Sequence, residues 1–354
     1  MPTAFILGQG FTQRSGPMAV ENVFSSRKHW AGWAFGVLAL AAVILVVFHL
    51  GDLHHFVALA QGAEPLWLLL AVGLQLLTYV CAGAVWYCAL ARIGQSRPMM
   101  SLMQLGIAKL FTDQILPSGG ISGTLMVVRG LARRQVPSHL AMGALLVGLV
   151  SFYAAYGIAA LAALGALWLH NQVNPAVIAI GAVFALFVTG LPLAILRLRR
   201  LKDGAWSRRL RRVPGVAQLL DSIAAAPSDL LHSPLVMAKT TFLQLGVFLL
   251  DGLTLNVMVL ALGQPNSLLS AYAAFMIASV VTTLGPIPLG LGTFEAAAVA
   301  TLALGGISLE AALAATLLLR GFTFWLPMLP GLWLTRQELG GRAISEVDAP
   351  LDQA

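Results

Sequence analysis

Charged side chains are scarce in this sequence. Only 10% of the 354 residues are Asp, Glu, Lys or Arg, whereas 58% are hydrophobic and the mean hydropathy is +0.85. Soluble domains carry about 25% charged residues, so the composition excludes a soluble globular enzyme or binding module. It indicates one polytopic membrane domain without a large soluble partner domain.

Cysteine is also rare, and Cys81 and Cys88 fall in the same apolar run. They share a helix face and cannot easily bond to each other, so a disulfide framework and a cysteine metal site are excluded. We expect both to be core residues. The sequence has no zinc-type His and Cys spacing, no Walker pattern and no nucleophile elbow. We therefore expect no metal, no cofactor and no catalytic activity.

The net charge is +7 and the pI is about 9.9. Because the arginines lie in loops between apolar runs, they indicate orientation toward the cytoplasm and not nucleic-acid binding. The strongest basic run, residues 197–212, is expected at the cytoplasmic surface, where it would contact anionic lipid. Residues 1–29 are expected to be a flexible cytoplasmic leader and not a cleaved signal, and residues 337–354 a short cytoplasmic tail.

Long apolar runs predict six spanning helices, since about 20 apolar residues cross a bilayer. They cover residues 30–50, 66–90, 139–169, 175–196, 235–262 and 309–334. Two further apolar segments, 101–130 and 268–306, are interrupted by Pro and Gly near their middles. The Lys and Arg distribution places both ends of the first segment in the cytoplasm and both ends of the second outside. We therefore predict an all-α membrane fold with two re-entrant helical hairpins that enter from opposite faces.

The order of these elements repeats within the predicted membrane domain, residues 30–336. A span, a hairpin and a span occupy about residues 66–169, and again residues 235–334, in opposite orientation. This order is typical of an inverted-topology repeat, in which broken helices at matching positions mark a transport site near the bilayer midplane.

Five ionisable residues are predicted at membrane depth, where each charge costs roughly 2.5–3.5 kcal/mol on insertion scales. They are Lys109, Asp113, Asp251, Glu295 and Arg320. Lys109 and Asp113 are four residues apart and can pair on one helix face, as a structural pair or as part of a site. Arg320 requires an anion, for which Glu295 and Asp251 are the candidates. Asp251 suits either a polar cavity wall or interhelical hydrogen bonds.

The sequence GPIPLGLG, residues 285–292, breaks the second hairpin and leaves N–H groups free at the start of a helix near Thr293. A helix N-terminus of this kind is a natural anion site, and a phospholipid head group carries an anion. The alternative is a simple structural turn. The matching sequence LPSGGISG, residues 116–123, in the first hairpin favours the site.

A family resemblance is carried by two segments. The first, IPLGLGTFEAAAVATLALGGISLEAALAATLLLRGFTFWLPMLPG, resembles the C-terminal signature of the lysylphosphatidylglycerol synthase transmembrane-region family, also called flippase-like membrane proteins. The second, LPSGGISGTLMVVRGLARRQVP, resembles the family's other signature. Leu289 stands where the family usually has glycine, and Thr124 stands where an acidic residue is common. The matching positions are Pro286, directly before the first segment, with Pro288, Gly290, Gly292, Glu295 and Arg320 in it, and Pro117, Gly123 and Arg129 in the second.

The resemblance implies a membrane region that moves aminoacylated phospholipid between leaflets, while a separate soluble domain makes that lipid. We expect this chain to lack the synthase domain and not to aminoacylate anything. Other stand-alone relatives are associated with lipid-linked sugars, polyprenyl phosphates or hopanoid pathways.

The sequence thus predicts a bacterial-type inner-membrane lipid flippase or transporter with both termini in the cytoplasm. The alternatives are a membrane enzyme that modifies a lipid head group and a non-transporting scaffold or regulator. The expected partners are the transported lipid, anionic lipid at the basic loop, and either a second copy or a lipid-synthesis enzyme, but no nucleic acid. The candidate substrate-binding residues are Glu295, Arg320, Gly290, Gly292, Thr293, Pro117, Gly123, Arg129, Asp251, Lys109 and Asp113.

Overall fold

The computed structural model describes residues 62–115, 121–169, 181–190, 232–265, 267–285 and 290–340, with the single residues 179, 193 and 230. Every regular element in these ranges is helical, as predicted. The first unit contains α3 (Pro65–Arg92), α4 (Met99–Ile115), α5 (Ile121–Arg133) and α6 (Ser138–Leu169). The second contains α11 (Pro234–Ala261), α12 (Leu268–Leu284), α13 (Thr293–Leu304), α14 (Leu309–Arg320), the π-helix η3 (Gly321–Trp325) and α15 (Leu326–Gly340).

Four of the described helices are long and apolar enough to cross a membrane. They are Pro65–Arg92, Ser138–Gly165, Pro234–Ala261 and the continuous run Leu309–Glu338. They correspond to four of the six predicted spans. The predicted span 30–50 lies outside the described residues, and 175–196 is described mainly over a short helix, Gly181–Gly190.

Helix boundaries repeat between the two units. α3 and α11 both contain 28 residues, and both begin with a proline at the first helical position, where its missing N–H is not needed. Both end just before a glycine with positive φ, Gly94 at 70° and Gly263 at 68°. α4 and α12 both contain 17 residues, and α5 and α13 contain 13 and 12.

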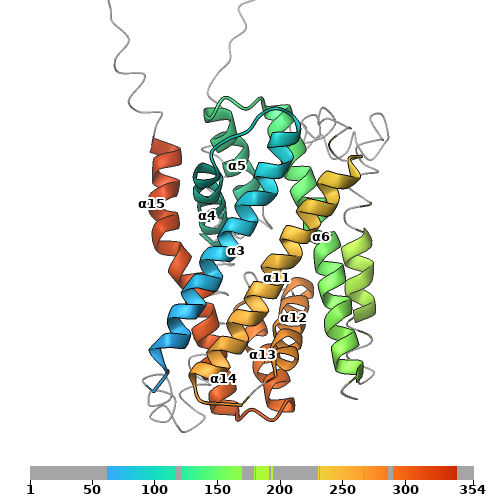
Figure 1. Ribbon diagram of the computed structural model, residues 1–354, viewed down its shortest axis with the longest axis vertical. Helices are drawn as coiled ribbons and strands as arrows, with labels where there is room; N and C mark the ends of the chain where they lie inside the picture. The colour runs from blue at the N-terminus through green and yellow to red at the C-terminus, as the bar shows by residue number, and fades with distance from the viewer. Residues whose placement is uncertain are drawn as a thin grey trace, which may run out of the picture.

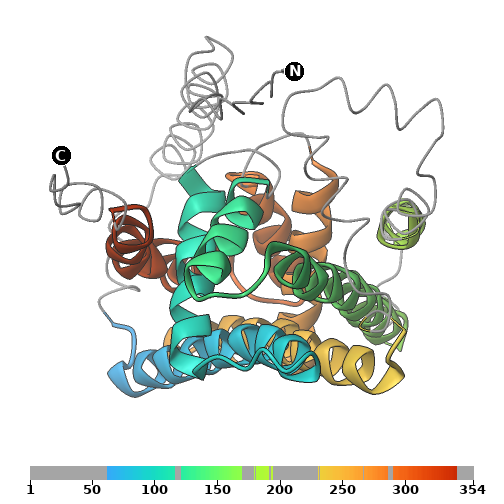
Figure 2. The same cartoon turned by 90° about the horizontal axis from the view of Figure 1, so that it is seen from above.

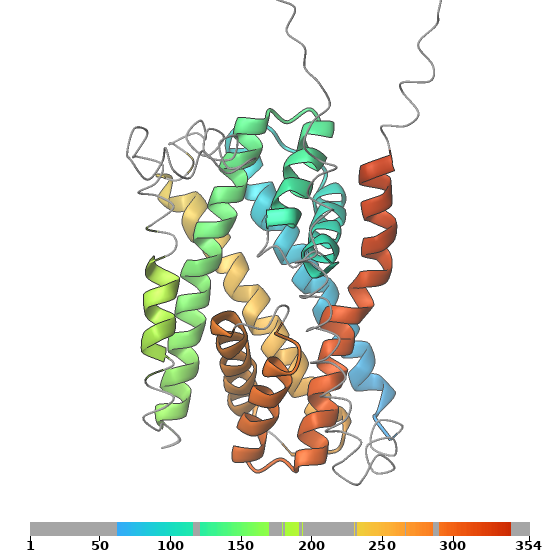
Figure 3. The ribbon, with the colours of Figure 1, turned by 180° about the vertical axis from the view of Figure 1, so that it is seen from behind.

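The contacts between helices repeat as well. α3 packs along α11, α4 packs on α3 and α5, and α12 packs on α11 and α13. α4 also contacts α15, and in the same way α12 contacts α6. Figures 1 and 3 show the α4–α5 pair in the upper half of the molecule and the α12–α13 pair in the lower half. Seen from above, α3 and α11 lie along one side of the bundle (Figure 2).

Small residues allow these helices to approach closely. Gly83 of α3 faces the Met103 side chain of α4, and Gly252 of α11 faces the Tyr272 ring of α12, with no room for a Cβ without a shift. Lipid chains are as apolar as leucine, so helix association in a membrane depends on such close packing. The core around α11, α12 and α14 is accordingly rich in buried alanine.

The last span differs from its prediction in two ways. It contains the wide turn η3, which ends two residues before Pro327, a residue without the N–H that a regular helix uses. It also continues to Gly340, past the predicted end at 334 and into the segment predicted as a tail. Its end is held near the end of α5, because Glu338 pairs at 2.6 Å with Arg134, the residue that follows α5.

Candidate functional site

Glu295 lies at the start of α13 and is 6% exposed. Its Oε2 accepts a hydrogen bond of 2.7 Å from the N–H of Gly292, the residue that precedes the helix. A glutamate at the third helical position can reach back in this way, and its negative charge stabilises the helix N-terminus. The sequence predicts that the N-terminus of α13 binds the anion of a lipid head group. In the structure, the Glu295 carboxylate accepts one of the N–H groups of this predicted site.

The turn before α13 requires glycine. Gly290 and Gly292 have φ values of 63° and 83°, a region that other L-residues rarely adopt. A Cβ on Gly290 would also collide with the Thr282 side chain of α12. The Thr293 hydroxyl donates to the Gly290 carbonyl at 3.1 Å, which closes the turn. The glycines thus let the turn pass close to α12, while Pro286 and Pro288 lie outside the described residues.

Arg320, at the end of α14, completes the cluster. Its Nε donates to Glu295 Oε1 at 2.8 Å, and one terminal nitrogen donates to the Gly290 carbonyl at 3.3 Å. The guanidinium also lies over the rings of Phe294 and Phe324, 4.6 and 5.4 Å from their centroids. The side chains of Arg320 and Glu295 are only 14% and 8% exposed. Of the two predicted anions, Glu295 is therefore the partner of Arg320.

The first unit contains a comparable arrangement. Lys109 and Asp113 of α4 pair at 2.6 Å, as their spacing predicts. The other oxygen of Asp113 accepts a 2.8 Å hydrogen bond from the Gly123 N–H at the start of α5. In both units, the second short helix thus begins against a carboxylate that also holds a cation. This shared geometry was not predicted, because it depends on how each helix pair folds back at its turn.

The composition of the two clusters determines which ligands the turns can bind. Each contains a helix N-terminus, a carboxylate and a cation, so charges of both signs lie at the same place. An incoming anion must displace the carboxylate from the N–H group, and an incoming cation must displace Arg320 or Lys109. A zwitterionic or amino-bearing head group could satisfy both charges after the pair opens.

The other predicted site residues lie apart from these clusters. Asp251 accepts a hydrogen bond from the buried Gln75 of α3 and does not bond to Arg320. Arg129 is exposed on α5 and joins neither pair in the described part of the chain. Pro117 and the basic segment 197–212 lie outside the described residues, so the predictions about them stay open. In the ranges described, no group of three metal-ligating side chains occurs.

Sequence reasoning missed the ion pair at the end of α15. Arg134 donates to Glu338 at 2.6 Å, and Arg133 bonds to the Gln337 carbonyl at 3.0 Å. Arg97 in turn donates to the Arg134 carbonyl at 2.8 Å. Glu338 lies more than two hundred positions from Arg134, so no local spacing indicated the contact.

We expect Glu338→Gln to lower the stability of the purified protein by about 1–3 kcal/mol, because Arg134 would lose its charged partner. Thermal unfolding in detergent measures the change. Glu310→Gln, at an exposed position at the start of α14, is the matched control and should shift the midpoint less. Equal midpoints for the two variants would show that the Glu338 pair does not hold α15.

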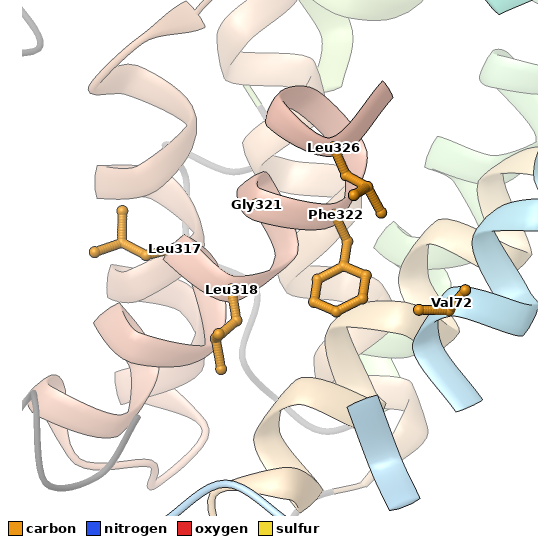
Figure 4. Close-up of a pocket in the computed structure, with 6 residues that line it drawn as sticks. All are labelled: Val72, Leu317, Leu318, Gly321, Phe322 and Leu326. Carbon is orange, nitrogen blue, oxygen red and sulfur yellow. The ribbon is translucent and has the colours of Figure 1, made fainter. Parts of the chain in front are cut away.

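An apolar groove lies between α3 and the last span. It has a volume of about 460 Å³ and is lined by Val72, Leu317, Leu318, Gly321, Phe322 and Leu326. Figure 4 shows Phe322 and Leu326 turned toward Val72 of α3 across the groove. Leu318 lies two positions before Arg320 in the chain, and Gly321 directly follows it. One turn of helix therefore presents hydrocarbon on the groove side and an ion pair toward α13.

The chain was compared with known proteins. The family model described as "Lysylphosphatidylglycerol synthase TM region" matches residues 33–331, which include both turns and both ion pairs. No curated protein matches the chain in sequence.

Proposed function

The chain belongs to the lysylphosphatidylglycerol synthase transmembrane-region family, and on this premise we propose that it is a flippase that moves a polar lipid between membrane leaflets. The main support is that each unit has a pair of half-length helices whose turn holds a partly or fully buried carboxylate and a cation. Such broken helices at matching positions are the usual substrate-binding elements of transporters with inverted repeats.

We propose that α4–α5 and α12–α13 are re-entrant hairpins in an inverted repeat. At 1.5 Å per residue, helices of 17 and 12 residues reach about 26 and 18 Å, less than the roughly 30 Å of hydrocarbon. The opposite ends occupied by the two pairs and the repeated contacts support this arrangement (Figure 3). The tips would then lie near the midplane, where buried charges need protein partners.

We propose that the bundle end carrying Arg97, Arg133 and Arg134 faces the cytoplasm of an inner membrane. The lipid head group would open the Glu295–Arg320 pair, its phosphate would bind Arg320 and the α13 N-terminus, and an amino group would bind Glu295. Because no step alters the head group, the proposal includes no catalysis. Relative movement of the two units would then expose the site to either side.

We propose that the apolar groove beside Arg320 holds a hydrocarbon chain of the transported lipid. Gly321 offers a test, since a Cβ there would meet no atom within 4 Å. Gly321→Leu should therefore fill the groove without a clash and slow lipid translocation several-fold. Gly165→Leu is the control, because Gly165 of α6 also has open space around its Cβ and lies away from the groove. Equal rates for both variants would contradict the assignment of the groove.

The function itself is tested by translocation of head-group-labelled lipids in proteoliposomes that contain the full chain. The proposal requires that one lipid class crosses faster than in empty vesicles. If every lipid crosses at the empty-vesicle rate, the scaffold alternative is favoured. If instead the purified protein converts a labelled lipid into a new product, the enzyme alternative is favoured.

A further inference from the structure

A third, half-buried carboxylate lies in the middle of the bundle, apart from the two turn clusters. Asp251 is in the middle of α11 and faces α3, where Gln75 Nε2 donates to its Oδ1 at 3.1 Å. The same nitrogen lies 3.2 Å from the hydroxyl oxygen of Thr254. Gln75 and Thr254 are 3% and 0% exposed. The polar group therefore lies inside the packed α3–α11 interface.

Asp251 differs from the other carboxylates of the described helices in its lack of a cation. Asp113, Glu295 and Glu338 each have a Lys or Arg nitrogen within 2.6 to 2.8 Å. Glu64 and Glu310 are exposed at helix starts. Among the described residues, Asp251 bonds only to a neutral amide. An ionised carboxylate without a cation is costly at membrane depth, and the acid form removes that charge.

Tyr79 adds a second unusual feature at the same interface. Its hydroxyl is buried and has no hydrogen-bond partner among the described residues. Tyr79 lies one turn after Gln75 on α3, so the two side chains share the face that meets α11. An unpaired phenol hydroxyl therefore lies on the same face of α3 as Gln75, the residue that donates to Asp251.

Within the described part of the chain, the helices packed against α11 bring no further cation toward Asp251. α11 contacts α3, α6, α12 and α14. The Tyr156 ring of α6 stacks on Phe248, one turn before Asp251, with 4.8 Å between centroids. Arg320 of α14 is bound to Glu295. The titratable groups that these helices direct toward α11 are Tyr79 and Cys81 from α3, Tyr156 from α6 and Tyr272 from α12.

We propose that Asp251 is a proton-binding site that couples lipid movement to the proton gradient across the membrane. The inference rests on the proposed flippase function and deepens it. The carboxylate would accept a proton from one side of the membrane, becoming a neutral acid, and release the same proton to the other side. No other reactant is needed.

The location of Asp251 explains how protonation would affect transport. α3 and α11 are the corresponding first helices of the two units, and they pack along each other (Figure 2). A negative charge at this interface favours a form in which water reaches the carboxylate, whereas the neutral acid favours the closed interface. Protonation would thus shift the relative position of the units, as a local charge change does in other two-state proteins.

The first experiment detects the proton directly. Infrared spectra of the full chain in lipid bilayers are recorded over a range of pH for wild type, Asp251→Asn and the control Glu310→Gln. We expect a carboxylic-acid carbonyl band that depends on pH, is present in the control and is missing from Asp251→Asn. Asparagine retains an oxygen that can accept the Gln75 hydrogen bond, so the variant should fold. Identical spectra for wild type and Asp251→Asn at every pH would overturn the proposal.

The second experiment measures the coupling. Translocation of labelled lipid is compared with and without an imposed pH gradient in proteoliposomes. Wild type and Glu310→Gln should change rate several-fold with the gradient, whereas the rate of Asp251→Asn should be the same with and without the gradient. If wild type moves lipid at a rate that the gradient does not alter, the coupling is wrong and the flippase function stands. If no lipid moves although the Asp251 band is present, the flippase function is wrong and the coupling fails with it.

Discussion

Replacing Arg320 with glutamine is expected to abolish lipid translocation and to destabilise the protein. The change leaves Glu295 as a buried carboxylate without its cation, although the Gly292 N–H still donates to it. Removing one partner of a buried ion pair costs on the order of 3–5 kcal/mol. Thermal unfolding in detergent measures the stability, and flipping of labelled lipid in proteoliposomes measures the activity. Arg336→Gln, at an exposed position of α15, is the matched control and should behave as wild type.

A double variant separates a structural pair from a binding site. Arg320→Gln with Glu295→Gln contains no buried charge, so most of the lost stability should return, since neutral side chains can replace a buried ion pair at little cost. If the pair binds the lipid head group, translocation should stay absent in this stable protein. Recovery of both stability and translocation in the double variant would show that the pair is only structural.

The second large effect is expected at Gly123. A Cβ at this position would collide with the Asp113 carboxylate, which accepts the Gly123 N–H and holds Lys109. Gly123→Ala should therefore displace the carboxylate and leave a polar group of α5 unsatisfied, a loss of about 1–3 kcal/mol. We expect lower thermal stability together with slower lipid translocation.

Gly73→Ala is the control for this substitution. Gly73 also lies within a helix, but a Cβ there meets no atom within 4 Å. Alanine favours helix by about 1 kcal/mol over glycine, so this variant should be unchanged or slightly more stable. A Gly123→Ala protein as stable and active as Gly73→Ala would mean that the Asp113 contact has no role.

Several features could be predicted from local sequence. The apolar runs predicted α3, α6, α11 and the last span to within a few residues at most boundaries. The Lys109–Asp113 pair follows from a spacing of four on a helix. The rule that a charge at membrane depth requires a partner predicted an anion for Arg320 and left Glu295 and Asp251 as the candidates, of which Glu295 is the partner. The start of α13 at Thr293 follows from the glycines before it.

Other features depend on which helix faces meet, and the sequence carries little information about that. α6 is apolar on all sides, so its hydrophobic pattern indicates no preferred face. The Gln75–Asp251 and Arg134–Glu338 contacts each join residues far apart in the chain. The wide turn η3 was also missed, although Pro327, two residues after its end, could have indicated a disturbed helix. Helix packing in three dimensions determines the two long-range contacts.

The central claim is that the turn clusters bind a lipid head group during its passage between leaflets. The most direct measurement is translocation of a panel of head-group-labelled lipids by wild type and by the Arg320→Gln, Glu295→Gln double variant, each reconstituted as a folded protein. The account predicts that one lipid class crosses with wild type and stops at the empty-vesicle rate with the double variant. Equal translocation by both proteins would contradict the account, because the lipid would then cross without this site.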